Sequence, residues 1–299
     1  MCGIVGLFFK HSAATPTLGV LLARMLSQMA ERGPDSTGFA LYGDAAPVGT
    51  FKATLYASGV QYDWTAFQAE LSAAFPPAQA VRCYGSHAVF TIGADQWQFL
   101  SWLTCHHPEI VNFGFGERIE VFKEVGLPGA VAQRFDLEHR SGTHALGHTR
   151  MATESAVTTA HSHPFSSGLD LCLVHNGSLS NHNRVRQSLR REGVRFATDN
   201  DTEVAAGYLL WRLWQGMSLT QALEAALADL DGFYTFAVGT KDGFAILRDP
   251  IACKPAVLAE TDDWVAMATE YRAIATLPGA STAEIWEPRP AQVYCWQRQ

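Results

Sequence analysis

The sequence predicts an α+β fold, in which amphipathic helices and antiparallel sheets pack in layers. In a few stretches, apolar residues recur three or four positions apart, as on one face of a helix. Between these stretches lie short apolar runs bounded by turn residues, as expected for strands. An Asp-Gly pair at positions 242 and 243 predicts a hairpin between two such runs. Because strand-like runs cluster in pairs, antiparallel pairing is favoured over a strict strand–helix–strand repeat.

Four helices are expected. The first covers residues 17–31, and its apolar face consists of Leu18, Leu21, Leu22, Met25, Leu26 and Met29. Another begins at a capping box formed by Ser218 and Gln221, in which each side chain bonds to the backbone of the other. The remaining two are expected at about 181–192 and about 202–215, each followed by a glycine.

Strands are expected at seven short apolar runs: residues 3–9, 39–42, 144–148, 169–175, 233–238, 244–247 and 264–268. The stretch from about 43 to 140 reads differently, since it is rich in Trp, Phe, Gly and Pro and shows no regular pattern. We expect it to be an irregular insertion.

Composition excludes several classes of protein. The chain of 299 residues is 47% apolar and 17% charged, which is typical of a globular protein. The net charge is −7 and no long basic block occurs, so a nucleic-acid partner is not expected. The longest run without Asp, Glu, Lys or Arg has 15 residues, 155–169, whereas a membrane span needs about 18 or more apolar residues. With no basic and apolar leader visible, we expect a cytoplasmic protein.

The six cysteines, at positions 2, 83, 105, 172, 253 and 295, show no Cys-x-x-Cys spacing. Cys105-His106-His107 and His161-Ser162-His163 are possible ligand pairs, but neighbouring strand residues point to opposite faces. We therefore expect no metal site. Five of the cysteines are expected to be small buried apolar residues in a reducing compartment.

Cys2 differs from the other cysteines because it follows the initiator Met1 and begins a glycine-flanked strand. If Met1 is removed, Cys2 carries a thiol with a pKa of about 8.5 and an α-amine with a pKa of about 7.7 to 8.0. One residue would then supply both nucleophile and base. The alternative is an ordinary buried cysteine in a first strand.

Four motifs occur in order along the chain and favour the catalytic interpretation: ERGPDSTG at 31–38, GHTRMAT at 147–153, HNG at 175–177 and TDNDTE at 198–203. Together with the initial MCGIVG, they closely resemble the class II glutamine amidotransferase domain, a member of the N-terminal nucleophile hydrolases. The resemblance covers residues 2–42 and 141–278. It implies a four-layer α/β/β/α sandwich of two antiparallel sheets, and a single amidotransferase domain over 2–299 with an insertion at about 43–140.

The resemblance also implies roles for individual residues. Cys2 matches the nucleophile, and Asn176 with Gly177 matches the oxyanion hole, where an amide and a backbone N–H face the tetrahedral oxygen. Arg150 matches the arginine that holds the glutamine α-carboxylate, and Asp201 the carboxylate that binds the substrate ammonium group. Each also has a purely structural alternative: a surface ion pair for Arg150, a hairpin signal for Asn-Gly, and a helix N-cap for Asp201.

Four further residues belong to the neighbourhood of this expected site. Thr153 and the backbone near Met151 match the wall of the glutamine pocket, whereas Arg32 and Asp35 are expected to brace the loop over it. Met151 itself departs from the family pattern, in which many members have an aromatic residue after the pocket arginine.

The spacing between the motifs also departs from the shorter family members, since 111 residues separate Gly38 from Arg150. With the segment VFKEVGLP at 121–128, the chain looks most like the amidotransferase subunit of N-methylglutamate synthase and related glutamate-synthase-like assemblies. No phosphate-loop or dinucleotide fingerprint is present. The expectation is therefore a glutaminase with no cofactor of its own, which delivers ammonia to a separate synthase subunit, flavin-bearing by resemblance.

Two other functions remain open from the sequence. The first is a free-standing amidase for another γ-glutamyl compound, fully active without a partner. The second is a non-catalytic amino-acid-binding or scaffold subunit, in which a retained Met1 blocks the α-amine. The aromatic residues of the 43–140 stretch are either interface anchors or core residues: Trp64, Phe67, Phe75, Tyr84, Phe90, Trp97, Phe99, Trp102, Phe113 and Phe115.

Overall fold

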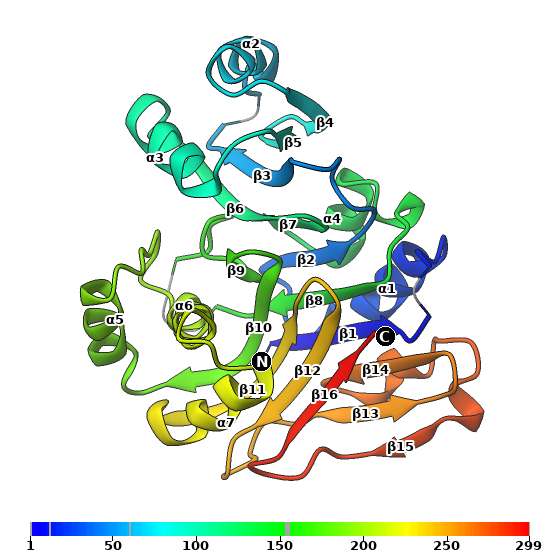
Figure 1. Cartoon of the computed structure of the whole chain (residues 1–299). Helices are drawn as coiled ribbons and strands as arrows, with labels where there is room; N and C mark the ends of the chain where they lie inside the picture. The colour runs from blue at the N-terminus through cyan, green and yellow to red at the C-terminus, as the bar shows by residue number, and fades with distance from the viewer. Residues whose placement is uncertain (1, 12, 60, 153–155, 299) are drawn as a thin grey trace.

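Two antiparallel sheets packed face to face form the centre of the molecule, and helices cover their outer faces (Figure 1). The computed structural model describes residues 2–11, 13–59, 61–152 and 156–298. The larger sheet has seven strands. In spatial order they are β15 (Glu284–Trp286), β13 (Val257–Glu260), β14 (Trp264–Ala268), β1 (Gly3–Phe9), β8 (His144–Arg150), β2 (Ser36–Tyr42) and β7 (Ile119–Val125).

The second sheet has five strands and contains two hairpins, β9–β10 and β11–β12. In spatial order they are β16 (Val293–Gln297), β12 (Gly243–Arg248), β11 (Gly232–Gly239), β10 (Leu171–Leu179) and β9 (Phe165–Gly168). The predicted Asp242-Gly243 turn joins β11 to β12, which pair antiparallel. The four-layer α/β/β/α sandwich of two antiparallel sheets is thus confirmed.

Strand β1 shows how the sequence pattern fits between two layers. Val5, Leu7 and Phe9 contribute to the core beneath the helices, whereas Ile4 and Phe8 contribute to the core between the two sheets. Both faces of the strand are buried, which explains its almost continuous apolar run. The strand pairs with β14 on one edge and with β8 on the other, so it lies inside the sheet.

The helices divide between the two outer faces. Helices α1 (Leu18–Ser27), α4 (Pro128–Arg134) and α8 (Tyr271–Ile274) pack on the seven-stranded sheet, and α5 (His182–Arg191), α6 (Asp201–Trp214) and α7 (Leu219–Asp229) lie on the side of the five-stranded sheet. The capping box of Ser218 and Gln221 is present at the start of α7. All four predicted helices and all seven predicted strands are found; the strands at 3–9 and 264–268 have the predicted ends, and the ends of the other elements are shifted.

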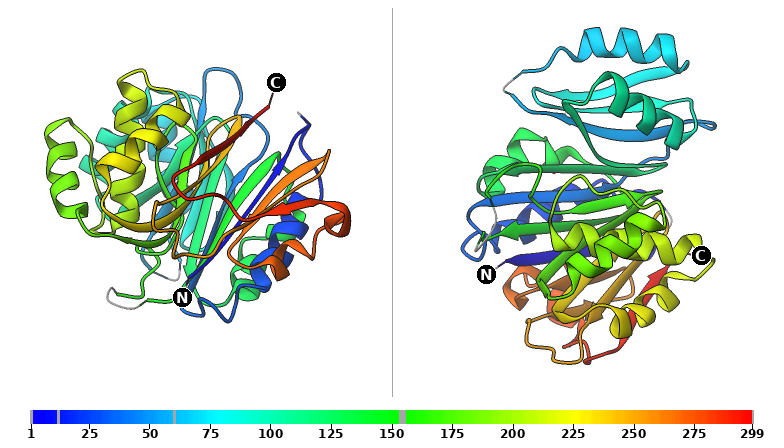
Figure 2. Two further views of the ribbon diagram at one scale, coloured as in Figure 1. Left: turned by 90° about the horizontal axis from the view of Figure 1, so that it is seen from below. Right: turned by 90° about the vertical axis from the view of Figure 1, so that its left-hand side faces the viewer.

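The expectation that residues 43–140 are irregular is wrong. A third sheet, of four strands, is formed by β4 (Ala78–Tyr84), β5 (His87–Ile92), β3 (Phe51–Ala57) and β6 (Ile110–Gly116). Helices α2 (Trp64–Ala74) and α3 (Gln96–His106) pack on it. Figure 2 shows this unit beyond the β7 end of the seven-stranded sheet. Strand β7 belongs to the main sheet, because it pairs with β2 along its whole length.

Most aromatic residues of this region are core residues and not interface anchors. Trp64, Phe67, Phe90, Phe99 and Phe115 are buried between the third sheet and its helices, since a four-stranded sheet needs its own apolar layer. Phe113 is buried between the sheets, and Tyr84, Phe75 and Trp102 are partly buried. Trp97 alone among the ten is largely exposed, at 44%.

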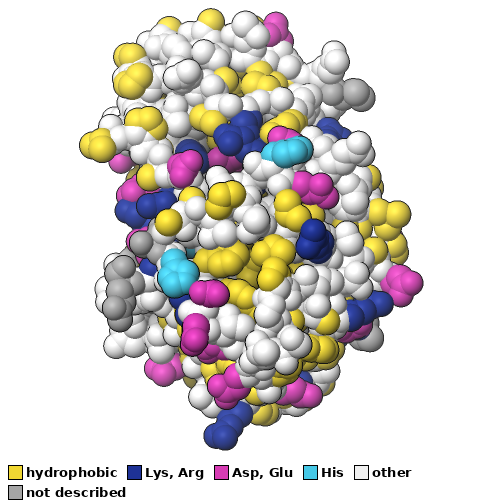
Figure 3. Space-filling view, turned by 90° about the vertical axis from the view of Figure 1, so that its right-hand side faces the viewer, with side chains coloured by type: hydrophobic (Ala, Val, Ile, Leu, Met, Phe, Trp, Pro, Cys, Tyr) yellow, Lys and Arg dark blue, Asp and Glu magenta, His cyan; other side chains and the backbone are white. Residues whose placement is uncertain are grey.

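Along the described residues, no helix combines the length and apolar character that a membrane span requires. On the face shown in Figure 3, acidic and basic side chains alternate with apolar ones, and in the part of this face that the structure describes the basic groups form no continuous stripe.

Candidate active site

The starts and ends of the central strands bring the first two motifs together. In the antiparallel pair of β1 and β8, Gly3 lies opposite Thr149. Cys2, just before β1, and Arg150, the last residue of β8, therefore lie at the same end of this strand pair. The Sγ atom of Cys2 lies 3.9 Å from the carbonyl oxygen of Met151. The Met151 side chain is 46% exposed. Cys2 is therefore next to the residues that the resemblance assigns to the glutamine pocket.

Asn176 reaches the same place from the other sheet. It lies in β10 with only 4% of its surface exposed, and its Nδ2 atom donates to the carbonyl oxygen of Cys2 over 3.4 Å. Gly177 follows with a φ of 142°, and a Cβ at this position would collide with the carbonyl oxygen of Phe233. The backbone here consequently accepts glycine alone, beside an amide that faces the Cys2 backbone.

Asp201 is the first residue of α6, but it is not the helix cap. The cap is Asn200, whose side chain accepts a hydrogen bond from the backbone N–H of Thr202. The Oδ2 atom of Asp201 accepts from the N–H of Leu179 over 2.9 Å, and its Oδ1 atom lies 3.8 Å from Nδ1 of His175. The carboxylate therefore ties α6 to β10, with 22% of its side chain exposed.

Arg150 ends β8 and is 4% exposed. Its Nη1 atom donates to the carbonyl oxygen of Ala156 over 3.1 Å. The predicted pocket residue Thr153 lies outside the described residues.

Arg32 and Asp35 contact the nucleophile segment and the arginine segment directly. Arg32 donates from Nε to the Cys2 carbonyl oxygen over 3.2 Å and forms an ion pair with Glu270. The carboxylate of Asp35 accepts a hydrogen bond from the N–H of Ala152 over 2.8 Å. The backbone N–H of Asp35 donates to the carbonyl oxygen of Arg150. Both residues hold the backbone on either side of the Cys2 thiol.

Glu270 was missed by sequence reasoning, because its partner Arg32 is 238 positions away and no local motif marks the pair.

A buried histidine network lies behind Asn176 and Asp201. The Nε2 atom of His163 lies 2.6 Å, and Nδ1 of His175 3.1 Å, from the hydroxyl oxygen of Thr202. The ring of His148 stacks on His163 at 4.1 Å and reaches the carbonyl oxygen of His175 with Nε2. Burial lowers the pKa of His148 to about 3 and that of His163 well below its ordinary value. The rings of His148 and His163 are thus neutral near pH 7 and act as packing and hydrogen-bonding groups.

Lys123 of β7 is also buried, with 2% exposure, and was not singled out from the sequence. Its Nζ atom donates to the Ala160 carbonyl over 3.1 Å and lies over the rings of Phe113 and Phe165. Burial lowers the pKa of Lys123 to about 7. Within the described ranges, no three His, Cys, Asp or Glu residues are grouped as a metal site would require.

Comparison with known proteins decides the family. A model described as "Glutamine amidotransferase domain" matches residues 148–276. The "Glutamine amidotransferase-like protein GlxB" of Rhizobium meliloti is 53% identical over 300 residues, covering 100% of this chain and 99% of the relative. The chain belongs to the class II glutamine amidotransferases. A "Putative glutamine amidotransferase" of Methanothermobacter thermautotrophicus is 32% identical, covering 98% of this amidotransferase and 99% of the relative.

Solved structures agree on the fold of this class II glutamine amidotransferase. The glutamine phosphoribosylpyrophosphate amidotransferase of B. subtilis, complexed with ADP and GMP, aligns with a TM-score of 0.62 and 20% identity. The alignment covers 99% of this chain and 47% of that one, so the chain spans about half of the solved protein. At this identity the likeness concerns the fold alone, that of the N-terminal nucleophile hydrolases.

Proposed function

We propose that this class II glutamine amidotransferase hydrolyses glutamine to glutamate and ammonia at Cys2. The observation that carries the proposal is the meeting of Cys2 with Asn176, which donates to the Cys2 carbonyl oxygen over 3.4 Å. Two strands of different sheets thereby bring a thiol and a side-chain amide donor into one place, beside the segment of Arg150 and Met151.

The reaction follows from these groups. Once Met1 is removed, the α-amine of Cys2 takes the proton of the thiol, and the sulfur attacks the side-chain amide carbon of glutamine. Asn176 Nδ2 and the N–H of Gly177 stabilise the oxyanion of the tetrahedral intermediate. The C–N bond then breaks, the protonated α-amine gives its proton to the departing ammonia, and a glutamyl thioester remains. Water attacks the thioester, which releases glutamate and restores the thiol.

The amino-acid head group of glutamine is bound by two charges. Arg150 receives the α-carboxylate, for which a planar guanidinium is suited, and Asp201 receives the ammonium group. The hydrogen bond from Leu179 occupies Oδ2 of Asp201, whereas Oδ1 has only the longer contacts with the Thr202 hydroxyl, at 3.5 Å, and with His175, at 3.8 Å, and is assigned to the substrate. Met151 and Thr153 complete the wall of the pocket.

We further propose that the ammonia is used by a separate synthase subunit, as in N-methylglutamate synthase or a glutamate-synthase-like assembly, with flavin in that partner. The described residues form the four-layer sandwich and the third sheet, and neither carries a phosphate loop or a dinucleotide fingerprint. The resemblance of the sequence to such subunits supports the transfer of ammonia to a synthase. A partner should then raise the glutaminase rate, whereas a lone amidase would be fully active alone.

The proposal is tested by intact mass and covalent trapping. We expect a chain that lacks Met1 and takes up one equivalent of a glutamine-like electrophile on Cys2. Cys2→Ala should abolish both labelling and glutamine turnover while the melting temperature stays close to that of the unmodified protein. Cys83→Ala is the matched control, because Cys83 is exposed and lies in the third sheet. A retained Met1 would favour a binding subunit without catalysis, and labelling of Cys83 or Cys105 would refute the assignment of Cys2.

A further inference from the structure

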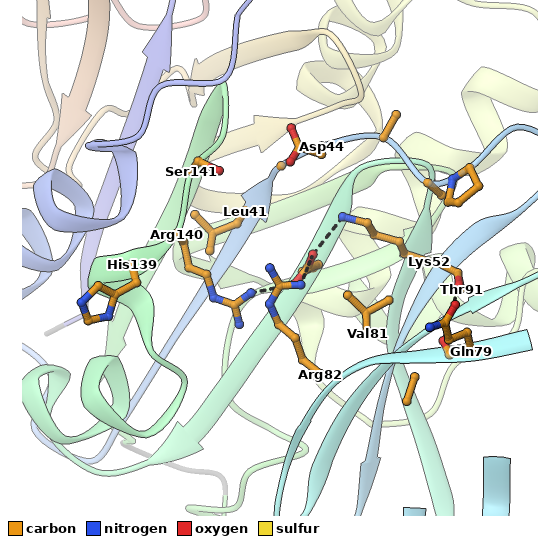
Figure 4. A pocket seen from close by; sticks show the side chains of 16 residues that line it. Leu41, Asp44, Lys52, Gln79, Val81, Arg82, Thr91, His139, Arg140 and Ser141 are labelled. Atoms are coloured by element: carbon orange, nitrogen blue, oxygen red, sulfur yellow. Dashed lines mark hydrogen bonds and ion pairs between the residues drawn. The ribbon is translucent and has the colours of Figure 1, made fainter.

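A cavity of about 480 Å³ lies where the third sheet meets the seven-stranded sheet. Its wall combines the loop after β2, strands β3, β4, β5 and β7, and the turn around Arg140 (Figure 4). None of the residues assigned to glutamine hydrolysis lines it. The volume is within the range of sites for small metabolites.

Three basic side chains in this cavity converge on one carboxylate. Lys52 Nζ lies 2.9 Å from Glu120 Oε1, and Arg140 Nη1 lies 3.3 Å from Glu120 Oε2. Arg82 Nη1 lies 3.8 Å from Oε1 of the same group. The side chains of Lys52, Arg140 and Glu120 are each less than a tenth exposed. Figure 4 shows the three basic side chains pointing toward one another from different segments.

The positive charge of the cluster is only partly neutralised. Three cations face Glu120, and the exposed Asp44 at the rim is the second carboxylate of the wall. Buried charges are expensive unless they are paired, so an excess of positive charge in such a cavity favours an anion. His139 at the rim adds no free positive charge, because it already pairs with Asp136.

Hydrogen-bond donors also remain available. The buried Nε atom of Arg140 has no hydrogen-bond partner among the described residues. Among the described residues, the Arg82 guanidinium has an ion pair with Glu120 at 3.8 Å and no hydrogen bond, although it has five donors. A bound carboxylate or phosphate would satisfy such donors in pairs.

We propose that this cavity binds a small anionic metabolite that carries a carboxylate or phosphate group. Arg82 and Arg140 hold the anionic group, and Lys52 neutralises it. Glu120 keeps the three cations in position when the anion is absent. Lys52 and Arg82 belong to the third sheet, whereas Glu120 belongs to the main sheet and Arg140 precedes its strand β8. A bound anion would therefore strengthen the contact between the third sheet and the seven-stranded sheet.

The test is calorimetric titration of the full-length protein with inorganic phosphate and with succinate, each against the uncharged succinamide. We expect millimolar or tighter binding of at least one anion and none of succinamide. The stronger of the two anions identifies a phosphate or a carboxylate ligand. Arg82→Gln should weaken this binding by at least about tenfold, because a charge-assisted contact is lost. Arg82 is 36% exposed and makes no close hydrogen bond, so the variant should retain its melting temperature.

Arg191→Gln, on α5, is the matched control and should bind as the unmodified protein does. Absence of heat with both anions would overturn the proposal. So would equal affinity in Arg82→Gln and Arg191→Gln, because the anion would then lie elsewhere. The measurement needs no glutamine turnover, so its failure is distinguishable from a failure of the glutaminase proposal.

Discussion

The side-chain amide of Asn176 lies 3.4 Å from the carbonyl oxygen of Cys2, although the two residues are 174 positions apart. Arg32 donates to the same oxygen over 3.2 Å. The Cys2 carbonyl is therefore held both from strand β10 and from the turn between α1 and β2 before any substrate binds. Because the Cys2 backbone is fixed, the thiol needs only a side-chain rotation to change its direction.

Replacing Arg150 with lysine should affect glutamine binding far more than stability. An ammonium group cannot form the bidentate contact with a carboxylate. Loss of a buried charged contact costs about 2 to 5 kcal/mol, so the KM for glutamine should rise by one order of magnitude or more. Steady-state kinetics measure this change, and the melting temperature checks the fold. Arg191→Lys is the control on an exposed helix surface, and an unchanged KM in Arg150→Lys would show a purely structural arginine.

Asp201→Asn should raise the KM for glutamine while the melting temperature changes little. The amide oxygen of asparagine still accepts the hydrogen bond from Leu179, but the negative charge that we propose attracts the substrate ammonium group is lost. Asp199→Asn removes a carboxylate that is 85% exposed and should leave the KM unchanged. Equal KM values in the two variants would contradict the substrate-binding role.

Gly177→Ala should destabilise the protein strongly. The added Cβ would collide with the Phe233 carbonyl oxygen, at a φ of 142° that residues with a side chain rarely adopt. Backbone strain alone costs about 1 to 3 kcal/mol, and the clash adds to it. Gly216→Ala separates the two causes, since Gly216 has a φ of 84° but nothing lies within 4 Å of the position that a Cβ would take there. Denaturant unfolding should show the smaller loss at Gly216, and equal losses would argue against the close approach of Phe233.

Lys123→Met should flatten the dependence of stability on pH. Burial lowers the pKa of Lys123 from 10.5 to about 7 in the folded chain. Between these two values the unfolded chain binds more protons than the folded chain, so the free energy of unfolding rises with pH. Below about 7 both states carry the charge, and this contribution no longer changes with pH. Denaturant unfolding at several pH values between 7 and 10.5 measures the slope.

In this experiment Lys10→Met is the control, because Lys10 is 31% exposed and pairs with Glu260 at the surface. It should keep the slope that Lys123 contributes. The same slope in Lys123→Met and in the unmodified protein would show that Lys123 keeps its proton inside the fold.

Local patterns predicted the sandwich because its strands and helices have regular apolar spacing. The helical repeat from Leu18 to Met29 became α1, and the run 264–268 became β14 without a shift. The third sheet escaped prediction because its strands carry buried polar residues. Lys52 and Thr54 interrupt β3, and Lys52 is tolerated there only because Glu120 lies opposite it, 68 positions later.

The same limit applies to the candidate site. Motifs indicated Cys2, Asn176 and Asp201 because each lies in a short stretch of distinctive residues. The partners that fix their positions come from distant segments. Glu270 holds Arg32, and the Leu179 N–H holds Asp201, and neither contact leaves a local signature. Such pairs depend on how the strands are ordered in the sheets, which residue spacing does not specify.

The position of β1 inside the seven-stranded sheet has a consequence for biosynthesis. Val5 pairs with Ala268, so one edge of the first strand stays unpaired until most of the chain has left the ribosome. At about 5 to 20 residues per second, synthesis of the intervening segment takes on the order of 10 to 50 s. Throughout this interval the edge of β1 that later pairs with β14 stays open. If Met1 is removed, as the proposed function requires, this removal would come before β14 completes that edge of the sheet.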